Sequence, residues 1–421
     1  MTNRRQFLKS TVIGATWSIA TVARNRWALA RTVEAPSPKR LIVVFLRGAV
    51  DGLNVVVPYG DPDYYAARPG ISIPRPSSRN GVLPLDAYFG MHPALRALLP
   101  LWEHQQLAFV HACGSPDPTR SHFDAQDYME SGTPGAKTTA DGWMNRLLGQ
   151  LPGPHGPTDA LSFTPTLPRI LRGTMPVTNE LPEPGPNKMK PLDRPRIAEA
   201  FDSLYDGSDG LSRAYQEAQS ARQELRNTLA EATAEASAEI PSANRGASLV
   251  QGFALSAQRL GRLMDQDRSI RLGFVALGGW DTHVNQGRDS GQLANHLQGL
   301  ADGLAMLTRE LGASFADTTI LVMSEFGRTV HENGNGGTDH GHGNVLWLLS
   351  GDLRGRKVYG EWPGLARAQL YEARDLAVTT DFREVIVRVI ERQFHLTDLA
   401  LAAIFPDLAS RRSPLPALLR G

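Results

Sequence analysis

Uninterrupted apolar runs of strand length recur along this chain, and helical patterns separate several of them. The first run, Leu41–Leu46, is apolar at every position. A strand that is apolar on both faces is typical of a parallel sheet with helices on both sides. Further apolar or β-branched runs lie at 107–111, 270–277, 318–323 and 345–349, and helical periodicity at 94–104 and 293–311 precedes two of them. The pattern therefore predicts an α/β fold whose central sheet is mostly parallel and covered by helices on both faces.

The middle of the chain departs from this alternation. Residues 151–196 are rich in proline and glycine, which favours a long irregular excursion at the surface. Residues 211–239 carry an alanine-rich apolar stripe at helical spacing, which predicts one long helix. This helix either covers the sheet or offers its stripe to a partner in a coiled coil. Together these stretches predict an insertion at about 151–245 within a single domain that spans 31–421.

The N-terminus has the order of features found in an export signal. The pair Arg4 and Arg5 precedes Phe-Leu-Lys, a weakly apolar stretch at 10–23 follows, and a small-residue triplet ends at Ala30. This order predicts a twin-arginine signal peptide at residues 1–30. The alternatives are a membrane anchor or an amphipathic helix, but the stretch is shorter than the ~20 residues of a membrane span. We expect no stable membrane span, a periplasmic or secreted location, and the twin-arginine translocase as a partner during export.

Composition and charge exclude several classes of protein. Hydrophobic residues make up 41% of the 421 residues and charged residues 21%, as in ordinary globular proteins. The single cysteine, Cys113, excludes a disulfide scaffold, a zinc ribbon and a thioredoxin-type centre. The formal charge is +1, but residues 1–30 hold five cations and no acid, so the remainder has 39 cations against 43 acids. A net charge of −4 without basic runs gives no reason to expect a nucleic-acid partner.

Histidines and carboxylates gather where the predicted strands end, and their types suit a metal site. Two pairs stand out, Asp281 with His283 and His340 with His342, and Asp339 precedes the second pair. Alternate residues of an extended chain point to one side, so each pair can offer two ligands to one ion. Imidazole and carboxylate suit zinc, manganese or iron, and calcium or magnesium less well. The competing interpretation is a turn carboxylate that caps backbone amides beside a hydrogen-bonded histidine.

Two further clusters follow predicted strands. Glu325 comes after the run at 318–323 and can bind metal or act as a general base, while Arg328 can clamp an anionic ester. Alternatively, these two residues simply pair with each other on one helical turn. Asp51 follows the first run. Ser121 is either a nucleophile at a helix N-terminus, where the backbone favours an anion, or an ordinary helix N-cap.

Several motifs together carry a family resemblance. They are Arg47-Gly48-Ala49-Val50-Asp51-Gly52-Leu53-Asn54, Arg120-Ser121-His122-Phe123-Asp124, Gly279-Trp280-Asp281-Thr282-His283, Ser324-Glu325-Phe326-Gly327-Arg328-Thr329 and Gly337-Thr338-Asp339-His340-Gly341. In their order and combination, over residues 40–365, the chain resembles a bacterial family of exported proteins known as domain-of-unknown-function family number fifteen-oh-one. That family in turn resembles the alkaline phosphatase and sulfatase superfamily, which implies an alkaline-phosphatase-like fold with one or two divalent metal ions at the strand ends.

Carried over by position, the resemblance implies specific roles. The metal ligands would be Asp51, Asp281, His283, Glu325 and either His340 or His342, and the nucleophile would be Ser121. The chain departs from the superfamily where Glu325 and Phe326 replace an Asp-His pair, so that one histidine is missing unless Asp339 or His340 supplies a ligand. Arg47 also occupies the place where many members have their first aspartate. One metal ion is therefore easier to defend than two.

The favoured hypothesis is a metal-dependent hydrolase of phosphate or sulfate esters. In it the metal polarises an anionic small-molecule or polymer ester, Ser121 or a metal-activated water attacks, and Arg328 holds the anion. The alternative is a non-catalytic periplasmic binding or scaffold protein that keeps the fold and one structural metal. The position of Ser121 relative to Asp281, His283 and His340 separates a serine mechanism from these other possibilities.

Overall fold

The computed structural model describes residues 38–180, 201–229, 242–245, 247–406, 408 and 415–420. Contacts divide the chain after Ser37, and every described residue belongs to the unit that begins at Pro38. The predicted signal peptide at 1–30 lies outside the described residues. In the part of the chain that is described, no helix has both the length and the apolar character needed to cross a membrane.

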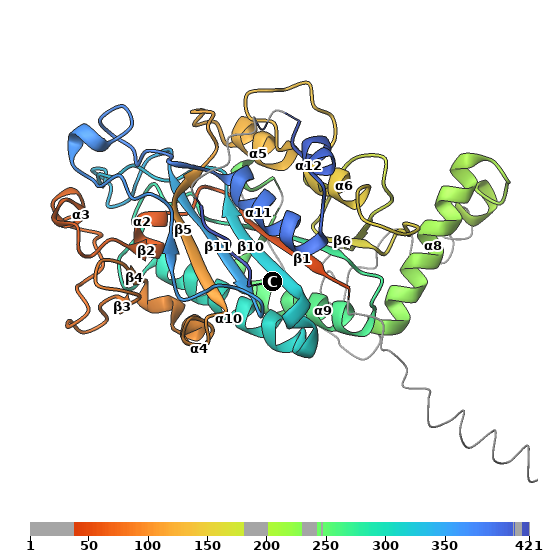
Figure 1. Ribbon diagram of the computed structural model, residues 1–421, viewed down its shortest axis with the longest axis horizontal. Helices are drawn as coiled ribbons and strands as arrows, with labels where there is room; N and C mark the ends of the chain where they lie inside the picture. The colour runs from red at the N-terminus through yellow and green to blue at the C-terminus, as the bar shows by residue number, and fades with distance from the viewer. Residues whose placement is uncertain are drawn as a thin grey trace, which may run out of the picture. The chain divides into compact units, whose positions relative to one another are not determined.

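A ten-stranded sheet forms the centre of the described fold (Figure 1). Its strand order is β12-β5-β11-β10-β1-β9-β6-β7, with β13 beside β5 and β8 beside β9. Neighbouring strands are parallel except on the two sides of β11. The bounds are β1 (Arg40–Leu46), β5 (Leu107–Gly114), β6 (Ala160–Phe163), β7 (Thr178–Glu180), β8 (Ser248–Leu249), β9 (Leu272–Gly278), β10 (Thr318–Ser324), β11 (Asn344–Ser350), β12 (Val358–Tyr359) and β13 (Thr380–Asp381). The predicted α/β fold with a mostly parallel central sheet is confirmed.

Helices and a small second sheet complete the described fold. The α-helices are α2 (Gly52–Val55), α3 (Pro62–Ala67), α4 (Leu99–Glu103), α5 (His122–Ser131), α6 (Trp143–Leu148), α8 (Gly210–Leu229), α9 (Phe253–Gln266), α10 (Gln292–Glu310), α11 (Phe382–Phe394) and α12 (Asp398–Ile404). Short 3-10 helices are η1 (Pro93–Leu98), η2 (Arg169–Leu171), η4 (Ser242–Asn244), η5 (Val250–Gly252), η6 (Gly312–Asp317) and η7 (Arg367–Gln369). The small sheet has the order β2 (Val56–Val57), β4 (Gly90–Met91), β3 (Leu83–Pro84).

Alternate residues of β1 enter two separate hydrophobic cores. Ile42 and Val44 pack in a core that includes the buried faces of α9 and α10. Leu41 and Val43 point the other way, into a core with α6, α11 and α12. Successive side chains of a strand point to opposite faces, so an apolar run without interruption is what a strand between two helical layers needs. The helices therefore cover both faces of the sheet, as the sequence predicts.

The proline-rich stretch is less irregular than its composition predicts. Within it β6 pairs in parallel with β9, and β7 pairs with β6, so the stretch extends the central sheet. The strand residues Ala160–Phe163 are all buried, but a four-residue run between proline and glycine clusters is too short to stand out in the sequence. The rest of this stretch, 181–196, lies outside the described residues. The helix predicted at 211–239 is α8, which is described as far as Leu229.

Candidate metal centre

Loops from distant parts of the chain meet at one edge of the central sheet. The strands β10, β1 and β9 are adjacent and parallel, so the segments that follow them leave from the same edge. The strand β11 runs in the opposite direction, and therefore the loop before Asn344 arrives at this edge. Because β5 is antiparallel to β11, it also ends there. Sites of open α/β sheets form at this edge, beyond the carboxyl ends of the strands.

Four side-chain atoms converge at this edge, and we refer to their residues, His122, Asp281, His283 and His340, as the candidate metal centre. The Nε2 atom of His340 lies 3.0 Å from the Nε2 atoms of both His122 and His283. The Oδ1 atom of Asp281 lies 3.1 Å from Nε2 of His283. It lies 3.4 Å from Nε2 of each of the other two histidines. Ligand-type atoms of His122, Asp281 and His340 are all within 4.8 Å of one another.

These separations fit a single metal ion. Four ligands bound about 2.0–2.1 Å from a tetrahedral zinc ion lie about 3.3 Å from one another. Within His122, Asp281 and His340, whose ligand atoms all lie within 4.8 Å of one another, the three separations are 3.0–3.4 Å. His283 lies 3.0 Å from His340 and 3.1 Å from Asp281 but is not part of this group of three. Two imidazoles with one carboxylate form a donor set that suits zinc, manganese or iron. The residues present therefore fit the divalent ion that the sequence predicts.

Each imidazole is held through its other ring nitrogen by a group that can only accept a hydrogen bond. The Nδ1 contacts are His122 to Glu325 Oε1 at 2.8 Å, His283 to Asp339 Oδ1 at 3.1 Å, and His340 to the carbonyl oxygen of Arg120 at 2.9 Å. A carboxylate or carbonyl partner requires the proton on Nδ1, which leaves the Nε2 lone pair available to an ion. This is the usual arrangement around histidines that bind metals.

Glu325 lies behind His122 and outside the four converging atoms. It is fully buried, and its oxygens accept hydrogen bonds from the backbone N–H of Gly48 at 2.8 Å, from Gln126 at 2.9 Å and from Ser324 at 3.0 Å, besides His122. Burial raises the pKa of the Glu325 carboxyl, but the hydrogen bond and charge of His122 outweigh burial and lower it. Glu325 is therefore placed to orient His122 as a carboxylate.

Arg328 is buried and holds Asp281. Its Nη2 lies 2.6 Å from Asp281 Oδ1 and 2.6 Å from the carbonyl oxygen of Gly48, and its Nε donates to the carbonyl oxygen of Ala49 at 2.7 Å. Burial raises the pKa of Asp281, whereas the hydrogen bonds from the histidines and the charge of Arg328 drive this pKa well below its usual range. For His122, burial lowers the pKa, but Asp281 and Glu325 raise it to about 9, so a bound ion would have to displace a proton from its Nε2. The candidate centre thus keeps a permanent carboxylate charge.

Gly48 allows the loop after β1 to pass directly against the loop after β9. Its φ is +114°, in the region that side chains disfavour, and a Cβ atom there would lie 2.8 Å from the backbone nitrogen of Asp281. Its own N–H and carbonyl bind Glu325 and Arg328. Gly48 therefore connects Glu325, which lies behind His122, with Arg328, which holds Asp281.

A family model described as "Protein of unknown function (DUF1501)" matches residues 38–405, which include every residue of the candidate metal centre. The chain belongs to this family. The family resemblance predicted from the sequence motifs is thereby confirmed. No curated protein matches the sequence.

This DUF1501 protein is similar to several solved structures at low identity. For the C-terminal periplasmic domain of EcEptC from Escherichia coli in complex with Zn, the identity is 11%, the coverage 76% of this chain and 74% of that chain, and the TM-score 0.37. For the PsFucS1 sulfatase from Pseudoalteromonas sp., the identity is 13%, the coverage 88% of this chain and 70% of that chain, and the TM-score 0.36. For the alkaline phosphatase from the Antarctic bacterium TAB5, the identity is 10%, the coverage 77% of this chain and 94% of that chain, and the TM-score 0.33.

Asp51 is engaged elsewhere in the DUF1501 fold. It is fully buried, and both of its oxygens bind the guanidinium of Arg68, at 2.7 and 3.0 Å. Gln286 donates to the same carboxylate at 2.7 Å. None of the contacts described for Asp51 involves the candidate metal centre. A role as metal ligand would require this carboxylate to leave a buried and fully paired arginine.

His342 and Ser121 are also in use in other contacts. The Nε2 of His342 donates to the carbonyl oxygen of Ser115 at 3.0 Å, and its ring packs against Tyr371. Ser121 is the N-cap of α5, where its Oγ accepts a hydrogen bond from the backbone N–H of Asp124 at 3.5 Å. The contacts described for these two side chains do not connect either of them to the four converging atoms.

His122 is the one residue of the candidate centre that the sequence analysis passes over. It lies in the motif 120–124, beside Ser121, and it is the first residue of α5. The signal was present, because His122 follows the strand β5 at the same edge as the other clusters. Of the two neighbours, the side chain of His122 faces the other donors, at 3.0 Å from His340 and 3.4 Å from Asp281, and that of Ser121 caps α5.

Proposed function

We propose that this protein is a metal-dependent hydrolase of phosphate or sulfate esters. The observation that carries the proposal is the convergence of the imidazole nitrogens of His122 and His340 with a carboxylate oxygen of Asp281, which lie 3.0–3.4 Å from one another. Permanently charged and oriented ligands of this kind are found where a metal ion assists hydrolysis. The predicted twin-arginine signal adds export to the periplasm or beyond as part of the proposal.

The candidate centre is open to solvent on one side. The side chains of His283, Asp281 and His340 are 38%, 33% and 27% exposed, whereas that of His122 is 9% exposed. An ester can therefore approach past His283 while Glu325 and α5 close the opposite side. When bound, a divalent ion would supply a Lewis acid that polarises the ester and lowers the pKa of water. The protein's part is to hold the four donors and to bind the anion.

Arg374 is the cation best placed to bind the anion. Its side chain is 44% exposed, and its Nη2 donates to the carbonyl oxygen of His340. Its Nε is held by the buried Asp375 at 2.8 Å, which fixes the side chain beside the candidate centre. Arg328, which the sequence analysis assigns to this role, is buried against Asp281 and backbone carbonyls. We therefore assign the anion contact to Arg374 and the positioning of Asp281 to Arg328.

Water rather than Ser121 is the nucleophile in this proposal, because the Ser121 Oγ caps α5. The attacking water would pass its proton to bulk solvent on the exposed side of the centre, and a bound divalent ion would lower the pKa for that loss. A serine nucleophile would need to leave its capping contact with the N–H of Asp124.

Hydrolysis of p-nitrophenyl phosphate and p-nitrophenyl sulfate by the full chain, loaded with zinc or manganese, tests the proposal. We expect turnover of at least one ester, loss of at least about 100-fold in His340→Ala, and a raised KM in Arg374→Ala. Ser121→Gly keeps a good N-cap residue and should retain kcat. Absence of turnover in every metal-loaded form would refute the hydrolase, and loss of turnover in Ser121→Gly would refute the assignment of water.

One feature favours a second candidate function, a non-catalytic metal-binding protein. Structural zinc sites are closed by four protein ligands, and His283, which lies 3.0 Å from His340 and 3.1 Å from Asp281, is the side chain that would have to shift to complete the set of His122, Asp281 and His340. A catalytic ion would instead be held by three of these side chains, with one position left for the ester or water. Tight metal binding that raises the thermal stability of the chain, without turnover of either ester, would establish this alternative.

A further inference from the structure

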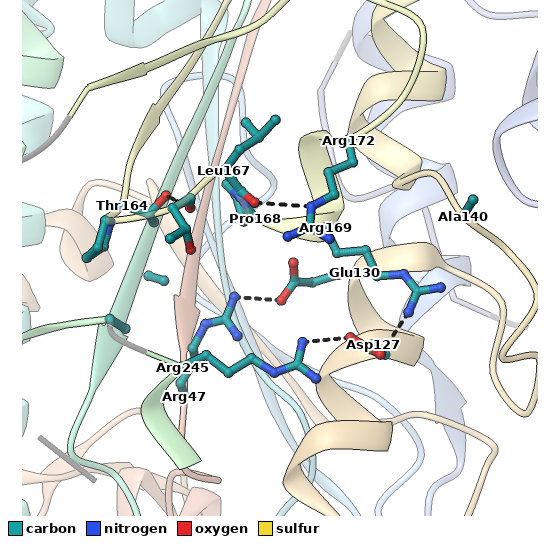
Figure 2. A pocket seen from close by; sticks show the side chains of 14 residues that line it. Arg47, Asp127, Glu130, Ala140, Thr164, Leu167, Pro168, Arg169, Arg172 and Arg245 are labelled. Carbon is teal, nitrogen blue, oxygen red and sulfur yellow. Dashed lines mark hydrogen bonds and ion pairs between the residues drawn. The ribbon is translucent and has the colours of Figure 1, made fainter. Parts of the chain in front are cut away.

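A second polar pocket, of about 470 Å³, lies at the other end of α5 (Figure 2). We call it the arginine pocket. Its charged lining residues are Arg47, Asp127, Glu130, Arg169, Arg172 and Arg245. None of them belongs to the candidate metal centre.

Positive charge exceeds negative charge in the arginine pocket. Glu130 pairs with Arg47 at 2.6 Å. The single carboxylate of Asp127 is shared by two guanidinium groups, those of Arg169 at 2.8 Å and Arg245 at 2.6 Å. Four arginines thus face two carboxylates, which leaves two positive charges without a carboxylate in the lining. An anion in this pocket would complete the charge balance.

N–H donors remain available for such an anion. The Nε of Arg169 has no hydrogen-bond partner among the described residues but is buried, so it is not one of these donors. Arg172 is exposed, and the one hydrogen bond described for its guanidinium runs from Nε to the carbonyl oxygen of Leu167 at 3.3 Å. Its two terminal nitrogens present the planar fork that binds phosphate and carboxylate groups through paired hydrogen bonds.

We propose that the arginine pocket binds an organic phosphate whose remaining part is polar, such as a sugar phosphate. Two uncompensated charges suit a phosphate dianion. The volume is within the range of small-molecule sites, roughly 300–1,000 Å³, and thus exceeds what inorganic phosphate alone would fill. None of the 14 lining residues is aromatic, so the pocket offers no ring on which a nucleobase could stack. Hydroxyl groups of a sugar would meet Thr164 and Thr166.

The occupant of the arginine pocket is a different molecule from the ester at the metal centre. His122 and Glu130 are eight residues apart on α5, which is about 12 Å along a helix. Arg47 and Gln126 lie between them, since Arg47 donates to Gln126 at 2.6 Å and Gln126 donates to Glu325 at 2.9 Å. The side chains of Arg47 and Gln126 thus form a chain of hydrogen bonds between the arginine pocket and Glu325. The inference therefore does not depend on the proposed hydrolase function.

Calorimetric titration of the metal-free full chain with glucose 6-phosphate tests this inference. We expect saturable binding of glucose 6-phosphate, weaker binding of inorganic phosphate and no binding of glucose. Arg172→Ala should weaken binding about tenfold, because it removes a charge-assisted hydrogen bond, and Arg172→Lys should restore part of the affinity. Arg79→Ala, which removes an exposed arginine outside the pocket, is the matched control. His340→Ala should bind as the parent does.

Four results would overturn the inference. The first is no saturable binding of glucose 6-phosphate. The second is equal binding by Arg172→Ala and the parent, which would place the ligand elsewhere. The third is loss of binding in His340→Ala, which would place the phosphate at the candidate metal centre. A preference for succinate over glucose 6-phosphate would contradict the assignment to phosphates.

Discussion

Replacing Glu325 with glutamine tests whether the buried carboxylate behind His122 tunes the candidate metal centre. Glutamine has nearly the same shape, so its amide oxygen can keep the contacts with Gly48, His122 and Gln126 that Oε1 now makes at 2.8, 2.8 and 2.9 Å. Its amide nitrogen can face the hydroxyl of Ser324, which is now 3.0 Å from Oε2. The substitution thus removes the charge and little else.

The expected magnitude follows from the loss of charge. Hydrogen bonds to a charged group contribute about 1.5–3 kcal/mol, and neutral ones about 1 kcal/mol. The bond from His122 Nδ1 to Glu325 should therefore weaken by about 1 kcal/mol or slightly more. Since 1.4 kcal/mol corresponds to a factor of ten, we expect metal affinity to fall about tenfold. This agrees with the 10–100-fold losses typical of residues that orient metal-binding histidines.

Competition with a chelator of known affinity measures the loss, with zinc as the metal and the full chain as the protein. Asp339→Asn is the matched control, because Asp339 orients His283 from an exposed position where solvent screens its charge. Its effect should be smaller than that of Glu325→Gln. A folded Glu325→Gln protein with parental affinity would refute the role of Glu325 in orienting His122.

Further predictions concern the residues around the site and the core. Gly48→Ala places a methyl group 2.8 Å from the backbone nitrogen of Asp281, at a φ of +114°. The free energy of unfolding should fall by about 1–3 kcal/mol, and chelator competition should show weaker zinc binding. Asp51→Asn should keep the metal, whereas Arg68→Met leaves the buried Asp51 carboxylate unpaired and should cost about 3–5 kcal/mol in urea denaturation. Burial lowers the pKa of His111 to about 4. Between about pH 6.5 and 4 the imidazole is therefore protonated in the unfolded chain but neutral in the folded one, so the free energy of unfolding should fall as the pH falls through this range. His111→Gln should flatten this slope, and an unchanged slope would contradict the assignment.

Much of the fold was predictable because the central strands are buried on both faces. The runs that form β1, β9 and β10 have no polar interruption, and the edge where they end follows from their parallel order. Asp281 and His283 come shortly after β9, so their place at that edge also followed from the sequence. The strand β6 could not be predicted from the sequence, because its burial depends on pairing with β9, more than a hundred residues later in the chain.

The division of roles within the site was less predictable. The sequence does not distinguish a carboxylate that faces an ion from one that lies behind a histidine, because the difference depends on depth below the surface. Glu325 is fully buried behind His122, and Asp339 lies behind His283 at the surface. The partner of Asp51 is Arg68, which reaches it through the packing of α3 and not through a local pattern. The roles of these residues as ligands or orienting groups stay predictions.

The metal content of the full chain, purified without chelator and after reconstitution with zinc, tests the central claim most directly. We predict about one equivalent of a transition metal in the parent and in Asp51→Asn, and loss of this metal in His122→Ala, His283→Ala and His340→Ala. Absence of metal after reconstitution of the folded parent, or full retention in the three histidine variants, would contradict a metal centre formed by these residues.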